Sequence, residues 1–179
     1  HLRSAIELVE HLGFAELRLM PCALPPHRET PACSAEHRAA MVELAVAGEV
    51  RLSCDRRELD RDGPSYTVDS LQELRNESGA AASLCLVMGC DAFLAIHSWK
   101  DWQRLLELAH IVVIGRPGWQ LPQAGPVADW LQRRVPRRKF FIVGDTSYGS
   151  CCVDAVAAAH YTADFLVHFG AACLAPVDS

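Results

Sequence analysis

The sequence lacks several features that assign a protein to a class at once. No apolar run approaches the roughly 18 residues that a membrane-spanning helix needs, so no membrane partner is expected. The eight cysteines include no C-x-x-C pair, the spacing typical of zinc sites. A Cys/His metal protein is therefore a distant alternative, and no metal-ligating residues are predicted. The formal net charge of −5 argues against a nucleic-acid partner. The beginning lacks the pattern of a signal peptide, so a cytoplasmic protein with free thiols is expected.

What the sequence does contain is an alternation of short apolar strands with amphipathic helices. Strands are expected over residues 17–20, 50–54, 84–88, 111–114 and 140–143. Helices are expected over residues 2–12, from a Ser34 cap to Gly48, from a Thr67 cap onward, from a Ser98 cap to Ala109, and over 127–134. The second helix is expected to bury Ala40, Met41, Leu44 and Ala45. This alternation favours an α/β fold with a doubly wound parallel sheet, in one domain.

In such sheets, ligands bind beyond the carboxyl ends of the strands, close to helix N-termini whose N–H groups suit anions. Polar residues and one glycine occur at several of these places: His1, His27, Arg28, Thr67, Gly89, Asp91 and Arg116. Each has an ordinary structural explanation, such as helix capping or an exposed loop, and Trp99 with Trp102 at i, i+3 is more often part of a core. Together they predict a site for a phosphorylated, aromatic ligand.

The order and spacing of these residues resemble the bacterial nicotinate mononucleotide adenylyltransferases, of the nucleotidyltransferase superfamily, over about residues 1–122. The resemblance is carried by His1-Leu2-Arg3, Pro25-Pro26-His27-Arg28, Ser34-x-x-x-Arg38-x-x-Met41, Arg57-Glu58-Leu59, Pro64-Ser65-Tyr66-Thr67, Gly89-x-Asp91-Ala92-Phe93, Trp99, Ala109-His110 and Arg116-Pro117-Gly118. It implies a Rossmann-like sheet of the nucleotidyltransferase type. It also implies transfer of AMP from ATP, accompanied by Mg²⁺, to nicotinate mononucleotide in NAD biosynthesis. The products would be deamido-NAD and pyrophosphate.

The resemblance implies an ATP side of the site. His1 corresponds to the second histidine of the family's H-x-G-H motif and would be catalytic, stabilising charge on the transferring phosphoryl group. His27 and Arg28 would contact the phosphates, with Arg28 able to bind in a bidentate manner. Gly89 and Asp91 match the segment that meets the adenosine ribose.

The resemblance also implies a site for the acceptor. Thr67 with Tyr66, and the Trp99–Lys100 peptide, match the positions that bind nicotinate mononucleotide, with Trp99 as the stacking face. A helix N-terminus favours the nicotinate carboxylate over the nicotinamide amide, which would turn its own NH₂ toward the N–H donors. Arg116 would add positive charge nearby. A homo-oligomer is a further expectation.

The chain departs from the family at both ends. The family's first strand and G-G-T-F-D-P-x-H-x-G segment would precede His1, so we expect a domain, residues 1–179, that is truncated at its N-terminus and lacks its first strand. Residues 144–179 are atypical: nothing in 146–179 matches the family's I-S-S-T-x-x-R-type motif, through divergence or a shifted reading frame. We therefore expect little adenylyltransferase activity from the chain itself. Alternatives are an adenylyltransferase acting on nicotinamide mononucleotide or phosphopantetheine, and a non-catalytic nucleotide-binding relic.

Overall fold

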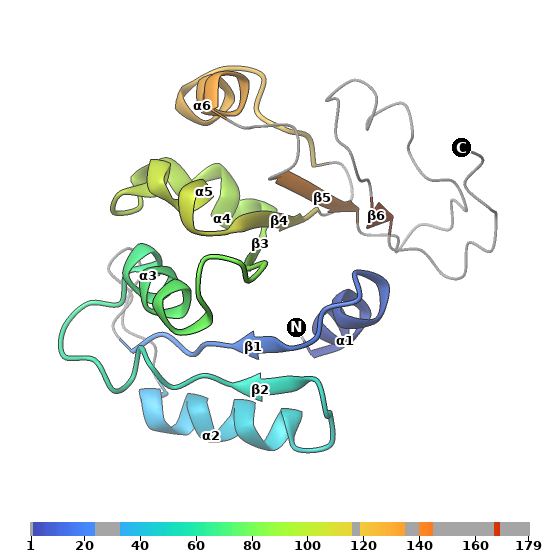
Figure 1. Ribbon diagram of the computed structural model, residues 1–179, viewed down its shortest axis with the longest axis vertical. Coiled ribbons are helices and arrows are strands. Elements are labelled where there is room, and N and C mark those ends of the chain that lie inside the picture. The colour runs from blue at the N-terminus through green and yellow to red at the C-terminus, as the bar shows by residue number, and fades with distance from the viewer. Residues whose placement is uncertain (1, 24–32, 116–118, 135–139, 145–166, 169–179) are drawn as a thin grey trace. The chain divides into compact units, whose positions relative to one another are not determined.

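The computed structural model describes residues 2–23, 33–115, 119–134, 140–144 and 167–168 of the chain (Figure 1). The chain divides into two compact units, His1–Ser70 and Leu71–Ser179, which we call the amino-terminal and carboxy-terminal units and describe in turn. That these units act as one domain stays a prediction. No helix in the described ranges is long and apolar enough to cross a membrane.

The amino-terminal unit is built on two parallel strands. In chain order its elements are α1 (Leu2–His11), β1 (Leu17–Leu19), α2 (Ala35–Val46), β2 (Leu52–Cys54) and the start of α3 (Thr67–Ser78). β1 and β2 pair from Leu17 opposite Leu52 to Leu19 opposite Cys54, and Figure 1 shows α2 running alongside β2. A cluster of buried side chains joins α1, α2 and β2: Ala5, Val9, Val46 and Leu52. The apolar face of α1 thus forms the core that its spacing predicts.

Helix α2 buries a different face from the one expected. Its N-cap is Ser34, whose side chain accepts the His37 N–H at 3.2 Å, as predicted. The predicted face is wrong, however, because Met41 and Leu44 are 65% and 79% exposed. The buried residues are Ala39 and Val46. Apolar residues occur on several sides of this helix, so their spacing could not choose between faces, and packing on β2 made the choice.

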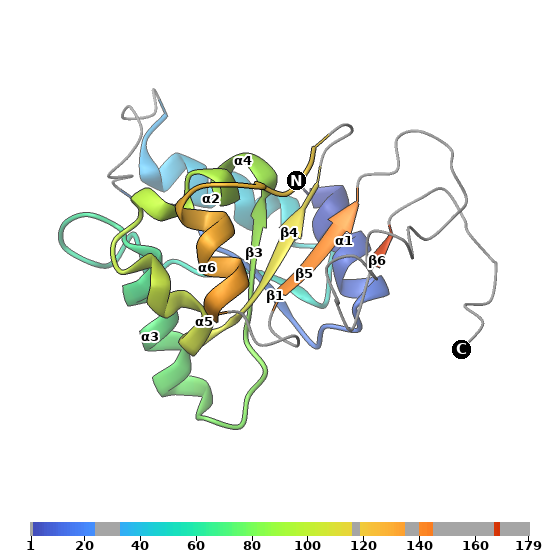
Figure 2. The same cartoon turned by 90° about the horizontal axis from the view of Figure 1, so that it is seen from above.

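The carboxy-terminal unit contains a four-stranded parallel sheet in the order β3-β4-β5-β6. After the remainder of α3, its elements are β3 (Cys85–Gly89), α4 (Cys90–Leu94), the 3₁₀ turns η1 (Ile96–Ser98) and η2 (Trp102–Arg104), α5 (Leu105–Leu108), β4 (His110–Ile114), α6 (Pro126–Arg134), β5 (Phe140–Gly144) and β6 (Val167–His168). Figure 2 shows the arrows of β3, β4 and β5 pointing the same way. Ile111, Val112 and Val113 are all buried, as expected for a strand covered on both faces. The expected α/β class with parallel strands is confirmed.

The single helix predicted from Ser98 to Ala109 is wrong. Ser98 ends the turn η1, Trp99 has extended backbone angles, and Asp101 adopts a left-handed conformation with φ 47°. Helical geometry resumes only in η2 and the four-residue α5. The apolar spacing that suggested one helix is satisfied instead by short turns that bury Leu105, Leu106 and Leu108. A left-handed residue interrupts the helix, and periodicity does not reveal it.

Candidate functional site

The first turn of α3 presents two backbone donors. The Tyr66 carbonyl accepts the N–H groups of Asp69 and Ser70 at 3.0 and 3.2 Å, so α3 includes Thr67 as its first residue. The expected Thr67 cap is therefore displaced by one position. Among the described residues, the N–H groups of Thr67 and Val68 have no hydrogen-bond partner, as the geometry of a helix start dictates. Together with the helix dipole, such donors suit an anion.

A buried polar cluster lies beside this turn, and it consists of Ala23, Glu58, Ser65 and Ser70. The Ser65 hydroxyl accepts the Ala23 N–H at 3.3 Å, and the Ser70 hydroxyl donates to the Glu58 carboxylate at 2.9 Å. Glu58, Ser65 and Ser70 are all buried. In the sequence, Glu58 and Ser65 occur only as members of the motifs, and no local pattern distinguishes Ser70. Only the burial of the three polar side chains draws attention to them.

Arg38 organises the backbone after β1. Its guanidinium donates to the carbonyls of Cys22, Ala23 and Cys33, the last two at 3.4 and 2.6 Å. These carbonyls lie on both sides of residues 24–32 in the sequence. Burial raises the pKa of the Cys22 thiol, so this side chain is a neutral group beside the guanidinium. His27 and Arg28, like His1 and Arg116, lie outside the described residues.

In the carboxy-terminal unit, the expected ribose-binding residues follow β3. Gly89 is the last residue of β3 and the N-cap of α4, and Asp91 is an exposed residue in the first turn of α4. Gly89 pairs with Ile114, so β3 and β4 end side by side, and Figure 2 shows α4 at the arrowhead of β3. The carboxyl ends of these strands thus carry Gly89 and Asp91, where ligands of parallel sheets bind.

Trp119, which the sequence analysis did not single out, also lies near these strand ends. Its ring packs edge-to-face on the fully buried Phe93 of α4, with the ring centroids 6.4 Å apart. Its buried indole nitrogen has no hydrogen-bond partner among the described residues. No local sequence signal distinguishes Trp119 from an ordinary loop tryptophan, because the contact joins residues far apart in the sequence.

The Trp99–Lys100 segment follows η1 in the same unit. The Trp99 N–H donates to the Ile96 carbonyl at 2.9 Å, so this N–H is already used within the protein. The Trp99 side chain is half-buried and Lys100 is exposed. The group that Trp99 itself can offer to a ligand is therefore its ring and not its backbone amide; its role as a stacking face stays a prediction.

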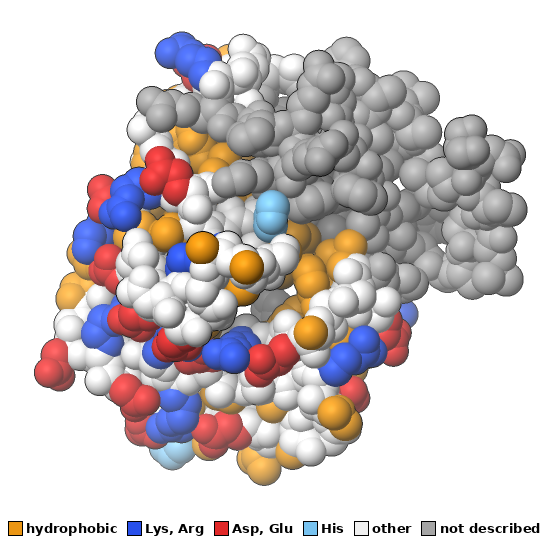
Figure 3. Space-filling model, in the orientation of Figure 1, with side chains coloured by type: hydrophobic (Ala, Val, Ile, Leu, Met, Phe, Trp, Pro, Cys, Tyr) orange, Lys and Arg blue, Asp and Glu red, His pale blue; other side chains and the backbone are white. Residues whose placement is uncertain are grey.

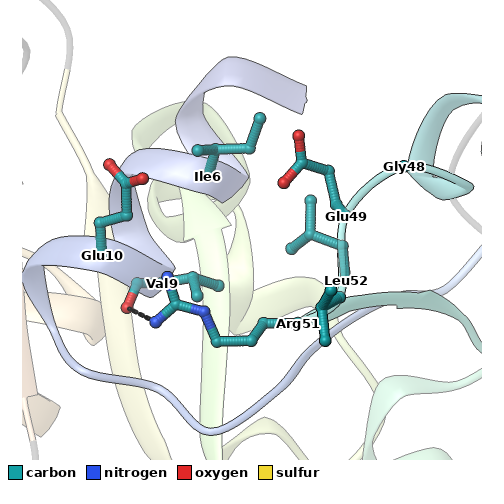
Figure 4. Close-up of a pocket in the computed structure, with 8 residues that line it drawn as sticks. Ile6, Val9, Glu10, Gly48, Glu49, Arg51 and Leu52 are labelled. Atoms are coloured by element: carbon teal, nitrogen blue, oxygen red, sulfur yellow. Dashed lines mark hydrogen bonds between the residues drawn. The ribbon is translucent and has the colours of Figure 1, made fainter.

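Two cavities among the described residues are lined by side chains other than these. One of about 230 Å³ is lined by residues of α1 and of the segment entering β2, including Ile6, Glu10, Glu49 and Arg51. Figure 4 shows the Arg51 guanidinium donating to the Val9 carbonyl, a contact of 3.4 Å. This cavity reaches β2 at its first residue, Leu52, and so lies at the amino end of the strand, away from the ligand-binding edge. A hollow of about 330 Å³ lies between η2 and α6.

In the part of the chain that the structure describes, surface charge and acidic clusters give no further site. On the face shown in Figure 3, acidic and basic side chains are interspersed over α2 and β2. Arg56, for example, bridges Glu36 and Glu43 at 2.5 and 2.9 Å. Within the described ranges, no three His, Cys, Asp or Glu residues gather as a metal ion requires.

Comparison with curated proteins decides the relationship. The chain is 52% identical over 127 residues to a Cellvibrio japonicus protein, covering 71% of this chain and 60% of that protein. It is 51% identical over 133 residues to an Aeromonas hydrophila protein, covering 74% and 62%. Both are named "Probable nicotinate-nucleotide adenylyltransferase". The chain is homologous to these two proteins over most of its own length. It spans about six tenths of the length of these relatives, and the resemblance carried by its motifs is confirmed.

Solved structures give the same fold. The chain superposes on the Plasmodium falciparum nicotinic acid mononucleotide adenylyltransferase complexed with NaAD with a TM-score of 0.59 and 14% identity, covering 82% of this chain and 70% of that one. A complex of the same enzyme with APC superposes equally well, with a TM-score of 0.59. These likenesses confirm the Rossmann-like fold that the adenylyltransferase motifs imply.

One family model matches the end of the chain. The model described as "Putative diphthamide synthesis protein" matches residues 117–179, about a third of the chain. Of this segment the structure describes only 119–134, 140–144 and 167–168. The match therefore includes the atypical residues 144–179 together with the preceding residues 117–143, and it is too short to assign the chain to that family.

Proposed function

We propose that the protein containing this chain transfers AMP from ATP to nicotinate mononucleotide, forming deamido-NAD and pyrophosphate. The observation that carries the proposal is the identity of about one half, over 127 residues, to relatives named for this activity. The α3 donors and the strand-end residues of β3 add support from the structure. Related transfer to nicotinamide mononucleotide or phosphopantetheine is the alternative within this class.

The reaction needs little covalent chemistry from the protein. A phosphate oxygen of nicotinate mononucleotide attacks the α-phosphorus of ATP and forms the new P–O bond. The bond from the α-phosphorus to the bridging oxygen breaks, and pyrophosphate leaves with that oxygen. Catalysis then depends on positioning and on neutralising charge at the transferring group. We propose that Mg²⁺ accompanies ATP, where it would supply positive charge to the phosphates during the transfer.

On the ATP side, we assign the ribose to Gly89 and Asp91. The exposed Asp91 carboxylate can accept hydrogen bonds from ribose hydroxyls, and Gly89 has no side chain to obstruct the approach at the end of β3. His1, His27 and Arg28 are proposed to contact the phosphates because they match the family's motifs residue by residue.

On the acceptor side, the N–H groups at the start of α3 are proposed to receive the nicotinate carboxylate, with Thr67 and Tyr66 at the site. The Trp99 ring is proposed to stack on the pyridine, beside Lys100, while Arg116 supplies positive charge. Two N–H donors at a helix start favour a carboxylate over an amide, because an amide can offer only one acceptor oxygen. Nicotinate is therefore the proposed acceptor.

The test compares acceptors in two proteins. The first is the 179-residue chain, and the second carries in addition the strand and G-G-T-F-D-P-x-H-x-G segment that the resemblance implies before His1. Each is incubated with ATP, Mg²⁺ and one acceptor, and dinucleotide and pyrophosphate are quantified by chromatography. We expect the extended protein to form deamido-NAD with a kcat/KM for nicotinate mononucleotide at least about tenfold above that for nicotinamide mononucleotide.

Two outcomes would contradict the proposal. Preference for nicotinamide mononucleotide or phosphopantetheine would move the activity to the related adenylyltransferases. Binding of ATP without formation of any dinucleotide would identify a non-catalytic relic. Appreciable deamido-NAD formation by the 179-residue chain alone would contradict the expectation that it is weakly active.

A further inference from the structure

We propose that Glu58 is a positioning residue for acceptor recognition, acting through Ser70 on the first turn of α3. The inference rests on the proposed function, since it concerns the two N–H groups that are to receive the nicotinate carboxylate. Glu58 itself is not placed against a substrate. Its effect would reach the acceptor through the backbone of α3.

The contact between Glu58 and α3 is buried. Glu58 lies in the segment between β2 and α3 and is 7% exposed, and Ser70 of the first turn is 2% exposed. The Ser70 hydroxyl donates to the Glu58 carboxylate at 2.9 Å, and an Arg61 nitrogen approaches the same hydroxyl at 3.3 Å. A buried polar group that loses its hydrogen-bond partner destabilises the folded state, because no new bond offsets the free energy of its desolvation. The pair therefore fixes the orientation of this turn.

A second attachment holds the residues just before α3. The Ser65 hydroxyl accepts the Ala23 N–H, and Arg38 binds the carbonyls of Cys22 and Ala23. The donors on Thr67 and Val68 lie in the sequence between these two attachment points, Ser65 and Ser70. The start of α3 is thus fixed on both sides of the groups that would meet the ligand, to the end of β1 and to the segment after β2.

Holding the start of α3 in one orientation should affect the choice between nicotinate and nicotinamide mononucleotide more than the affinity for either one. A hydrogen bond weakens steeply when its angle falls or its distance grows, and a carboxylate that accepts two N–H bonds needs both donors aligned. A turn that tilts would lose one of them and treat carboxylate and amide more equally. Loss of the Glu58 contact should therefore reduce the preference for nicotinate over nicotinamide mononucleotide.

The experiment uses the 179-residue chain and three substitutions. Glu58→Ala removes the acceptor for Ser70, and Glu58→Gln keeps a side-chain oxygen in the same place. The matched control is Ser53→Ala, because Ser53 donates to Glu16 at 2.6 Å in a pair of the same chemistry that is exposed and away from α3. Calorimetry gives the Kd of both mononucleotides, and hydrogen exchange gives the protection of the Asp69 and Ser70 amides, which donate to the Tyr66 carbonyl.

We expect Glu58→Ala to lower the ratio of the Kd for nicotinamide mononucleotide to the Kd for nicotinate mononucleotide about tenfold. Exchange at the Asp69 and Ser70 amides should become faster by a similar factor, because one buried hydrogen bond is lost. Glu58→Gln should keep most of the selectivity, and Ser53→Ala should keep all of it. A purely structural role would weaken both ligands alike and leave the ratio unchanged, which would overturn the proposal.

The unsubstituted chain distinguishes a failure of the proposed function from a failure of the role of Glu58. If the unsubstituted chain binds both mononucleotides equally or binds neither, the acceptor assignment fails, and the role of Glu58 fails with it. If the unsubstituted chain prefers nicotinate mononucleotide and Glu58→Ala matches Ser53→Ala in both measurements, only the positioning role is overturned.

Discussion

Asp101 offers a sharp test of the segment that carries Trp99 and Lys100. Among the described residues it is the one non-glycine residue with a positive φ, at 47° with ψ 34°. A left-handed conformation costs an L-residue about 1 to 2 kcal/mol, although aspartate tolerates it better than most. Asp101→Gly should therefore relieve backbone strain without changing the course of the chain.

The expected magnitude follows from two opposing contributions. Glycine removes the steric cost at Asp101 but adds conformational freedom to the unfolded chain, a loss of about 0.5 to 1 kcal/mol. The net gain in the free energy of unfolding should be about 0.5 kcal/mol. Ala95→Gly is the matched control, because Ala95 has a negative φ of −91°. There only the entropic loss applies, so the same change of residue should destabilise by about 0.5 to 1 kcal/mol.

Urea unfolding followed by tryptophan fluorescence measures both changes. With a denaturant slope of about 2 kcal/mol per molar, the two midpoints should move in opposite directions by roughly 0.25 to 0.5 M. A left-handed backbone at residue 101 predicts that Asp101→Gly raises the urea midpoint. If Asp101→Gly lowers the midpoint as far as Ala95→Gly does, the left-handed conformation is not maintained in solution.

Two further predictions concern titratable groups. Burial raises the pKa of Asp55, but hydrogen bonds from Arg57 at 2.7 to 2.9 Å outweigh it, and the net pKa lies below the ordinary value. The ionised Asp55 carboxylate thus stabilises the fold fully at a pH above its pKa in the unfolded state. This stabilisation is lost as the pH falls through its lower pKa in the folded state. Asp55→Asn should flatten the fall in the urea midpoint between about pH 5 and 2, and an unchanged acid limb would refute this. Iodoacetamide at pH 8, followed by mass spectrometry, should label the exposed Cys33 before Cys22, whose pKa burial raises, and equal rates would count against that placement.

The strands and the cap were within reach of sequence reasoning, because their signals are local. A continuous apolar run at residues 111–114 predicts a strand covered on both faces, and the structure buries Ile111, Val112 and Val113. Ser34 predicts a cap and forms one. The buried face of α2 and the break at Asp101 were missed, because both depend on what the segment packs against.

Some residues of the candidate site could be predicted from the sequence, and others could not. Tyr66, Thr67, Gly89, Asp91 and Trp99 could be chosen from motif order alone, and the structure places them at the start of α3, at the end of β3 and after η1. Their binding roles stay predictions. The polar cluster of Ala23, Glu58, Ser65 and Ser70 could not be derived from the sequence, because its hydrogen bonds join residues 12 and 42 positions apart.

The sequence by itself determined the α/β class, the order of most elements and the relationship to the nicotinate-nucleotide adenylyltransferases. It could do so because periodicity, capping and motif spacing depend on residues that are close together in the sequence. Only the tertiary structure decided which face of α2 is buried, that the Trp99 amide is already bonded, and that Glu58 supports the first turn of α3. Those features arise from contacts between distant segments, where burial decides which polar groups must find partners.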